Sequence, residues 1–304
     1  MTNPLTHDQV WRIAGITIAA ILLYAGFRLL PTGTNLNHMD FRVEGGSSIE
    51  FCDPSNPQFI PVVAVRSPVT MTLQPQGTAR AGAETRVQIR LTTSGGKPLG
   101  PDDLVVAHTR KLHLLIVDPS LDDYQHVHPE PGQKAGDWLV SFRPQAGGLY
   151  RFFADFTPAA TRRGLYASAD LEVEGPAQSP ALNRQPGLQQ ERGDVRFSLK
   201  AGTPSIQAGV TADLTFTLES KSGADLKLEP VMDAYAHLVA FDEKRGGFAH
   251  LHPIDADVSH RPDPRRPTLG FKVTIPQPGR YVIWAQVGLS GEEVFLPFWF
   301  DVVR

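Results

Sequence analysis

The sequence predicts an all-β protein, with two tandem antiparallel β-sandwich domains behind one N-terminal transmembrane helix. Three observations predict this class: one histidine pattern occurs twice, short strand-like runs fill most of the chain, and a long apolar stretch lies near the N-terminus. At 304 residues the chain is long enough for about two domains. Proline (26) and glycine (27) are plentiful, which favours short strands joined by turns.

The transmembrane helix is predicted from the apolar run IAGITIAAILLYAGFRLL at residues 13–30, which Val10 and Trp11 extend. Its length is close to the ~20 residues that span a bilayer. No A-x-A cleavage site follows it, which favours an uncleaved anchor over a signal peptide. We therefore expect residues 1–31 to be a single-pass anchor in a bacterial inner membrane. Residues 10–30 would contact lipid, and the bulk of the chain would lie in the periplasm.

Two irregular segments flank the first predicted domain. Residues 32–62 are expected to form an extended strap, because three prolines between positions 54 and 61 impose extended backbone. Phe59 and Ile60 suit a strap that lies on a surface, either of this chain or of a partner. Residues 176–193 are polar and contain proline, which is typical of a linker.

The two domains are predicted at residues 63–175 (repeat 1) and 194–304 (repeat 2). Each contains about seven short strand-like runs separated by turn residues, which is typical of an antiparallel β-sandwich. GGLYRFFADF in repeat 1 corresponds to PGRYVIWAQV in repeat 2, so that Tyr150 aligns with Tyr281. A tandem duplication explains this correspondence.

The duplicated pattern consists of three histidines, the second 13 residues after the first and the third two residues later, followed by proline. The six positions are His113, His126 and His128 in repeat 1, and His237, His250 and His252 in repeat 2. In an extended strand, histidines at i and i+2 point to one face. The strands of His113 and His237 are apolar on both faces, which predicts buried central strands. If each pairs with its H-x-H strand as a hairpin, three imidazoles converge.

Two interpretations of these histidines remain open. Three neutral imidazoles make a good site for Cu(II), Zn(II) or Ni(II). Five residues before the first histidine, His108 in repeat 1 and Met232 in repeat 2 would then be possible fourth ligands. Alternatively, buried imidazoles that donate and accept hydrogen bonds brace a turn or a neighbouring strand, and a duplication preserves such braces equally well.

The repeats resemble the tandem, cupredoxin-like, heavy-metal-associated periplasmic β-sandwich domains that have an HLH…HxHP pattern. The resemblance covers both repeats, but neither the anchor nor the strap. It implies copper handling outside the cytoplasm, so copper is the expected metal, with zinc as the alternative that the imidazole ligands allow. Blue-copper electron transfer is not implied, because that site needs a cysteine thiolate and neither repeat has a cysteine.

Several function classes are disfavoured. The single cysteine, Cys52, excludes an internal disulfide framework. The net charge of −3 gives no reason to expect nucleic acid. No set of residues with convergent catalytic roles is recognisable, so we do not expect an enzyme.

Two functions remain. The first is a non-enzymatic, membrane-anchored accessory or scaffold subunit, whose helix and sandwiches brace integral and periplasmic subunits of an inner-membrane complex. A photosynthetic reaction centre or a respiratory assembly is the kind of partner that this architecture suits. The alternative is a periplasmic copper-binding protein that uses a three-histidine cluster in each repeat.

Overall fold

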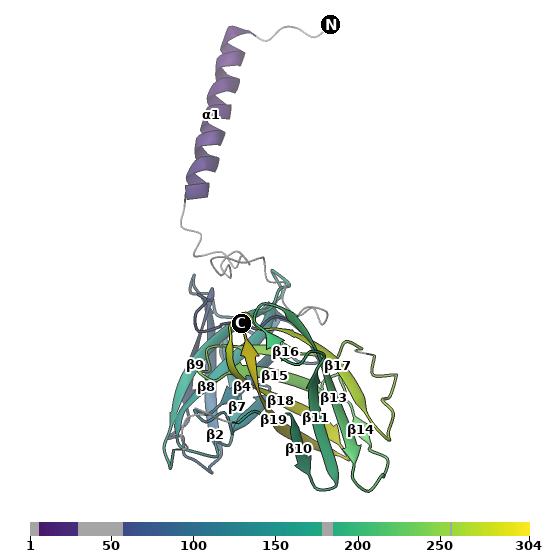
Figure 1. The fold of residues 1–304 in the computed structure, drawn as a ribbon. Helices are drawn as coiled ribbons and strands as arrows, with labels where there is room; N and C mark the ends of the chain where they lie inside the picture. Colours follow the sequence, from purple (N-terminus) through teal and green to yellow (C-terminus); the bar gives the residue numbers. More distant parts are fainter. Residues whose placement is uncertain (1–5, 30–56, 178–184, 256) are drawn as a thin grey trace. The chain divides into compact units, whose positions relative to one another are not determined.

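The computed structural model describes residues 6–29, 57–177, 185–255 and 257–304. It confirms the predicted fold class, since one N-terminal helix precedes two tandem β-sandwich repeats (Figure 1). Of the predicted segments, residues 32–56 of the strap, which include Cys52, and residues 178–184 of the linker lie outside the described residues.

The helix α1 (His7–Leu29) is long and apolar enough to cross a membrane. Large apolar side chains such as Trp11, Ile16 and Leu22 are exposed on its surface. A helix that exposes apolar side chains in this way needs lipid or another protein around it. This exposure, with the length of α1, suggests a single-pass membrane anchor.

Repeat 1 is a sandwich of two antiparallel sheets. The first has the strand order β1 (Val69–Pro75), β2 (Thr85–Thr93), β7 (Asp137–Phe142) and β6 (Glu130–Pro131). The second has the order β3 (Leu104–Val105), β8 (Gly148–Pro158), β4 (Leu112–Val117) and β5 (Tyr124–Val127), with β9 (Leu165–Val173) also paired to β8. A short 3-10 helix, Pro101–Asp103, precedes β3.

Repeat 2 has the same design. Its first sheet has the order β10 (Gln189–Arg192), β11 (Val195–Ala201), β13 (Thr211–Ser220) and β17 (Thr268–Thr274). Its second has the order β12 (Ile206–Gln207), β19 (Glu292–Val303), β18 (Gly279–Leu289), β15 (His237–Asp242) and β16 (Phe248–Leu251), with β14 (Leu228–Glu229) paired to β18. All pairs are antiparallel except that of β12 with β19.

The two repeats pack against each other through the sheets that contain β4 and β15 (Figure 1). On β4, Leu114 and Ile116 face the core of repeat 1, whereas Leu115 and Val117 face repeat 2. The predicted apolar character of both strand faces therefore has a physical reason, because each face is covered. A third core, rich in aromatic side chains, lies between the repeats.

Aromatic contacts across this third core are reciprocal. Tyr124 of repeat 1 lies 5.6 Å from Trp284 of repeat 2, measured between ring centroids. Phe248 of repeat 2 is equivalent to Tyr124, and Phe153 of repeat 1 is equivalent to Trp284. The centroids of Phe248 and Phe153 lie 5.4 Å apart. Equivalent positions of the two repeats thus contact each other in both directions, as an approximate two-fold relationship between the repeats requires.

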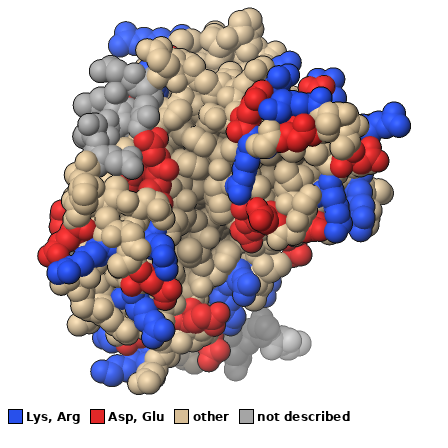
Figure 2. Space-filling model, turned by 90° about the horizontal axis from the view of Figure 1, so that it is seen from below, with Lys and Arg blue, Asp and Glu red and all other residues tan. Residues whose placement is uncertain are grey.

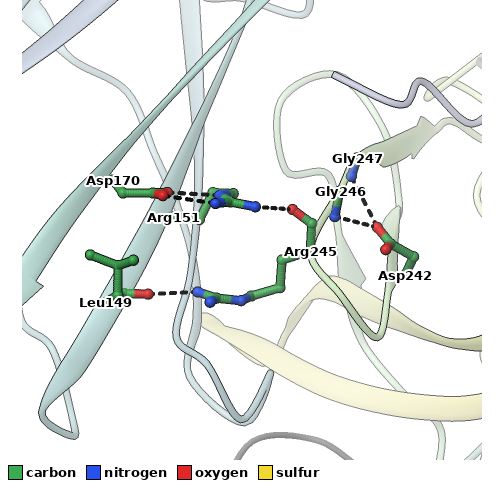
Figure 3. A network of polar contacts seen from close by, with 7 residues as sticks. All are labelled: Leu149, Arg151, Asp170, Asp242, Arg245, Gly246 and Gly247. Carbon is green, nitrogen blue, oxygen red and sulfur yellow. Dashed lines mark hydrogen bonds and ion pairs between the residues drawn. The ribbon is translucent and has the colours of Figure 1, made fainter. Parts of the chain in front are cut away.

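Hydrogen bonds close the edge of this interface (Figure 3). Arg151, on β8, pairs with Asp170 through two bonds of 2.7 Å and donates a third, of 2.8 Å, to the carbonyl of Arg245 in repeat 2. Arg245 in turn donates to the carbonyl of Leu149 at 2.6 Å.

In the view of Figure 2, charged side chains lie on two opposite sides of the molecule, and the surface between them is largely uncharged.

The described end of the strap docks on repeat 2. Phe59 and Ile60 are buried, and Ile60 exchanges two backbone hydrogen bonds with Phe248 at the edge of β16, of 2.8 and 3.1 Å. A Cβ at Gly247 would lie 1.9 Å from the Ile60 carbonyl oxygen, so the strap requires glycine there. Of the two surfaces that the sequence allows for the strap, residues 57–62 lie on that of their own chain.

Candidate metal centre

Each repeat brings its three histidines together through one hairpin. In repeat 1, β4 pairs with β5 so that Leu115 lies opposite His126, and in repeat 2, β15 pairs with β16 so that Val239 lies opposite His250. His113 and His237 lie two residues before these positions, on the same strand faces. We call His113, His126 and His128 trio 1, and His237, His250 and His252 trio 2. Within each trio the candidate ligand nitrogens lie within 4.8 Å of one another.

The two trios form a single cluster, which the sequence did not reveal. The imidazole centroids of His126 and His250, from opposite repeats, are 5.4 Å apart, and those of His113 and His250 are 5.7 Å apart. Within trio 1 the centroids are 5.0–5.4 Å apart. The trios meet because the strand faces that carry them are the faces buried between the repeats.

The tautomers of two histidines in trio 1 follow from their outer partners. His113 donates from Nε2 to the carbonyl of Ala107 at 2.9 Å. Gln286 donates from Nε2 to Glu293 at 2.7 Å, which orients its Oε1 towards His126, so His126 donates from Nδ1 to that oxygen at 2.9 Å. The inner nitrogens, His113 Nδ1 and His126 Nε2, therefore both present lone pairs, although they lie only 3.1 Å apart.

Two facing lone pairs repel unless a cation lies between them. The separation of 3.1 Å is near the ~3.3 Å expected between two nitrogens on one tetrahedral metal ion with metal–nitrogen bonds of about 2.0–2.1 Å. A proton is a poor alternative, because burial lowers the pKa of His113 to about 4 and that of His126 well below its usual value. The geometry of trio 1 thus fits two ligands of one metal ion.

Unpaired imidazole nitrogens point to the same chemistry. Among the described residues, seven buried side-chain polar atoms have no hydrogen-bond partner, and five of these are imidazole nitrogens: Nε2 of His128, His250 and His252, and both nitrogens of His237. Burying a polar atom without a partner costs about 1–3 kcal/mol. A bracing role would leave these atoms paired, whereas a metal ion would satisfy one nitrogen of each ring.

Burial keeps the cluster neutral. Desolvation lowers the pKa of His128 to about 4, and it lowers the pKa of His237, His250 and His252 well below the usual value, with neighbouring histidines adding to the effect. At neutral pH these rings are therefore neutral imidazoles, the form that coordinates metals.

Two further residues that the sequence reasoning missed orient the middle histidines, and they do so across the repeats. Asp155 lies opposite His113 on β8, and Gln286 lies opposite His237 on β18, so they are equivalent positions. Asp155 accepts a hydrogen bond from His250 Nδ1 at 3.1 Å, while Gln286 accepts from His126 Nδ1. Each repeat thus supplies the partner of the other repeat's histidine. The sequence signal for these partners was that Asp155 and Gln286 are polar residues at the same position of two aligned, otherwise apolar strands.

The two predicted fourth ligands occupy equivalent tight turns. His108 and Met232 have φ of 47° and 49°, and each is followed by another residue with positive φ. Backbone bonds between Ala107 and Arg110, and between Val231 and Ala234, close the two turns. Such φ values cost roughly 1 kcal/mol or more for a residue other than glycine. The turn of repeat 1 places the His108 ring on His252 of repeat 2, with centroids 3.7 Å apart, rather than within trio 1.

A small cavity of about 30 Å³ borders both trios. His108, His113, His250 and His252 line it, together with Asp155 and residues 57, 58 and 60 of the strap. Its volume admits about two water-sized molecules. Histidines of both repeats therefore border the same cavity.

A family model described as "Domain of unknown function (DUF8832)" matches the chain twice, at residues 64–174 and 190–304. The two matches correspond to the two sandwiches, and each contains one histidine trio. No curated protein matches the chain.

Solved structures resemble the chain only weakly. A putative membrane-anchored protein from Corynebacterium diphtheriae is 10% identical with a TM-score of 0.26, over 79% of this chain and 59% of that one. The bacterial integrin-binding protein invasin is 14% identical with a TM-score of 0.22, over 75% of this chain and 39% of that one. Fibronectin(III)-like modules of Clostridium thermocellum CbhA are 10% identical with a TM-score of 0.19, over 77% and 94%. TM-scores this low carry no functional argument.

Proposed function

Because the chain belongs to the family described as Domain of unknown function (DUF8832), through two copies of its domain, we propose one function for both copies. Each copy binds a transition-metal ion through its three histidines, at the junction of the two repeats. The observation that carries this proposal is the pair of facing lone pairs on His113 Nδ1 and His126 Nε2, 3.1 Å apart. The unpaired nitrogens of trio 2 support it independently.

The donor set selects the class of metal. Each trio offers three neutral imidazoles, which suit Cu(II), Zn(II) and Ni(II) better than the hard cations Mg²⁺ and Ca²⁺, which prefer oxygen ligands. We propose copper first and zinc second, because affinity for nitrogen ligands is highest for Cu(II) in the Irving–Williams order. Handling of copper in the periplasm is the corresponding biological role, as the resemblance to heavy-metal-associated domains implies.

Metal analysis tests the proposal directly. The full chain, purified in detergent, is stripped with a chelator, exposed to Cu(II) or Zn(II), desalted and assayed for metal by mass spectrometry. We expect up to two ions per chain, and about one after either His126→Ala or His250→Ala. The matched control is His260→Ala, because the His260 side chain is 75% exposed and outside the cluster. A chain that retains no metal would contradict the proposal.

The apolar helix supports a second, compatible proposal. Large apolar residues from Val10 to Tyr24 are exposed along α1, which suits contact with lipid and with integral membrane subunits. We propose that the helix holds the two sandwiches at the surface of a bacterial inner-membrane complex, as an accessory subunit. Extraction in mild detergent followed by native electrophoresis tests this, since migration as a lone chain of 33.3 kDa would argue against it.

A further inference from the structure

We infer that the two trios form one two-metal centre, in which the two ions share a small anionic ligand supplied by solvent. This inference rests on the proposed metal binding and deepens it. Metal binding alone would allow two independent sites, each complete within its own repeat. Three features of the cluster favour a shared centre instead.

The first feature is the packing of the rings. The centroid distances between His250 and the two rings His113 and His126 of the opposite repeat, 5.7 and 5.4 Å, match those within a trio. His126 also lies 6.4 Å from His237. Rings of the two trios are therefore in direct contact, as in two-metal sites whose ions are about 3.5–4 Å apart.

The second feature is the position of the cavity. It is lined by His113 of trio 1 and by His250 and His252 of trio 2, so that a molecule within it is adjacent to histidines of both trios. Three protein ligands leave a fourth position of a tetrahedral ion open. A cavity of about 30 Å³ suits hydroxide, a water molecule or a triatomic anion.

The third feature is charge. Two divalent ions bring a charge of +4 into a buried site whose six imidazoles are neutral when they coordinate a metal. Among the described residues, Asp155 is the carboxylate that contacts a trio directly, through His250. Buried charge is costly unless it is paired. An anion between the ions, such as hydroxide, offsets part of this charge, and its formation from a metal-bound water releases one proton to solvent.

Electron paramagnetic resonance of the Cu(II)-loaded chain tests the shared ligand. The full chain in detergent is loaded with one and then two equivalents of Cu(II), and the spin count is compared with the bound copper. At two equivalents we expect less than half of the copper to be detected, with a half-field signal from coupled ions. Azide, which fits the cavity and bridges Cu(II) ions, should shift the optical spectrum only when both ions are bound.

Removing one trio should uncouple the other. In His237→Ala, or in His252→Asn if that variant does not fold, we expect one bound ion and its full spin count. His260→Ala should retain the coupled pair. Two ions per chain with a full spin count and no half-field signal would overturn the inference while leaving metal binding intact, and so would a single ion per chain. If no copper binds, both the inference and the proposed function are wrong.

Discussion

The two histidine trios have the same spacing in the sequence and the same hairpin geometry, yet their surroundings differ. His126 of trio 1 is oriented by the amide of Gln286, whereas His250 of trio 2 is oriented by the carboxylate of Asp155. The ring of His108 stacks on trio 2. The strap pairs with β16, the strand that carries His250.

This difference shows what a duplication retains and what it changes. The spacing fixes which nitrogens converge, so both trios offer the same ligands. The basicity of those ligands depends on their outer partners, and a carboxylate makes an imidazole a stronger ligand than an amide does. We therefore expect trio 2 to bind a divalent ion more tightly than trio 1.

Acid should have the largest effect, because the buried histidines of both trios respond to it in one direction and Asp155 responds in the other. Burial lowers the pKa of His113 from 6.5 to about 4, so the unfolded chain binds a proton that the folded chain does not between these values. Stability is then lost as the pH falls from 6.5 to 4, by about 3 kcal/mol for His113 alone. The other buried histidines and the nearby charge of Arg110 act in the same direction.

The protonation of Asp155, beside trio 2, changes stability with pH in the opposite direction. Burial raises its pKa from 3.8 to about 7, so it contributes stability at low pH that is lost as the pH rises through this range. Urea unfolding of the metal-free chain between pH 4 and 7 measures the sum. We expect a net loss of stability below pH 6.5, and a steeper loss in Asp155→Asn. A midpoint independent of pH would show that the histidines are not buried as described.

Exchanging the outer partners should reverse the order of the two sites. In Asp155→Asn we expect the affinity of trio 2 for Zn(II) to fall by about 10–100-fold, and in Gln286→Glu that of trio 1 to rise. The double variant should then bind more tightly at trio 1. Competition titration with a zinc indicator measures both constants, and His237→Ala or His113→Ala assigns them. Equal affinities of trio 1 and trio 2 for Zn(II) in the unmodified chain would contradict the expected difference between the two trios.

Detaching the strap should loosen β16, the strand that carries His250, and leave β5 unchanged. In Gly247→Ala the new methyl group collides with the Ile60 carbonyl, so the strap must leave β16 at a cost of about 2 kcal/mol. Hydrogen exchange of the Ile60 and Phe248 amides should accelerate, while amides of β5 are unchanged. The matched control is Gly187→Ala, because a Cβ there meets no atom within 4 Å.

The smallest effect should come from His108. Removal of its ring in His108→Ala loses a stack worth about 1 kcal/mol on His252, so the affinity of trio 2 should fall by less than tenfold. The equivalent change, Met232→Ala, should leave trio 2 unchanged. If His108→Ala abolished binding at trio 2, His108 would be a ligand of that ion, and not of the ion in its own repeat as the sequence predicted.

Much of the fold could be predicted from the sequence because its signals are local. Alternating apolar residues gave strands such as β2 and β13, and the i, i+2 spacing placed His126 and His128 on one face. The hairpins of β4 with β5 and of β15 with β16 are confirmed.

The joining of the two trios depends on long-range packing, which no local pattern encodes. Leu115 and Val117 showed that the second face of β4 was apolar, but not that repeat 2 would cover it. The turn that carries His108 has neither glycine nor asparagine at its positive φ positions, so its shape could not be recognised. Asp155 and Gln286 became recognisable as partners only once the repeats were docked.

The exchange of Asp155 and Gln286 between repeats has a consequence for how this architecture arose. Position i of one repeat contacts position j of the other, and j contacts i, both here and in the aromatic pairs of the third core. That reciprocity defines an isologous interface, the kind found in C2 homodimers. The chain thus has the architecture of a C2 homodimer within one polypeptide, and because the halves are encoded separately, the two halves of its symmetric site can differ chemically, as Asp155 and Gln286 do.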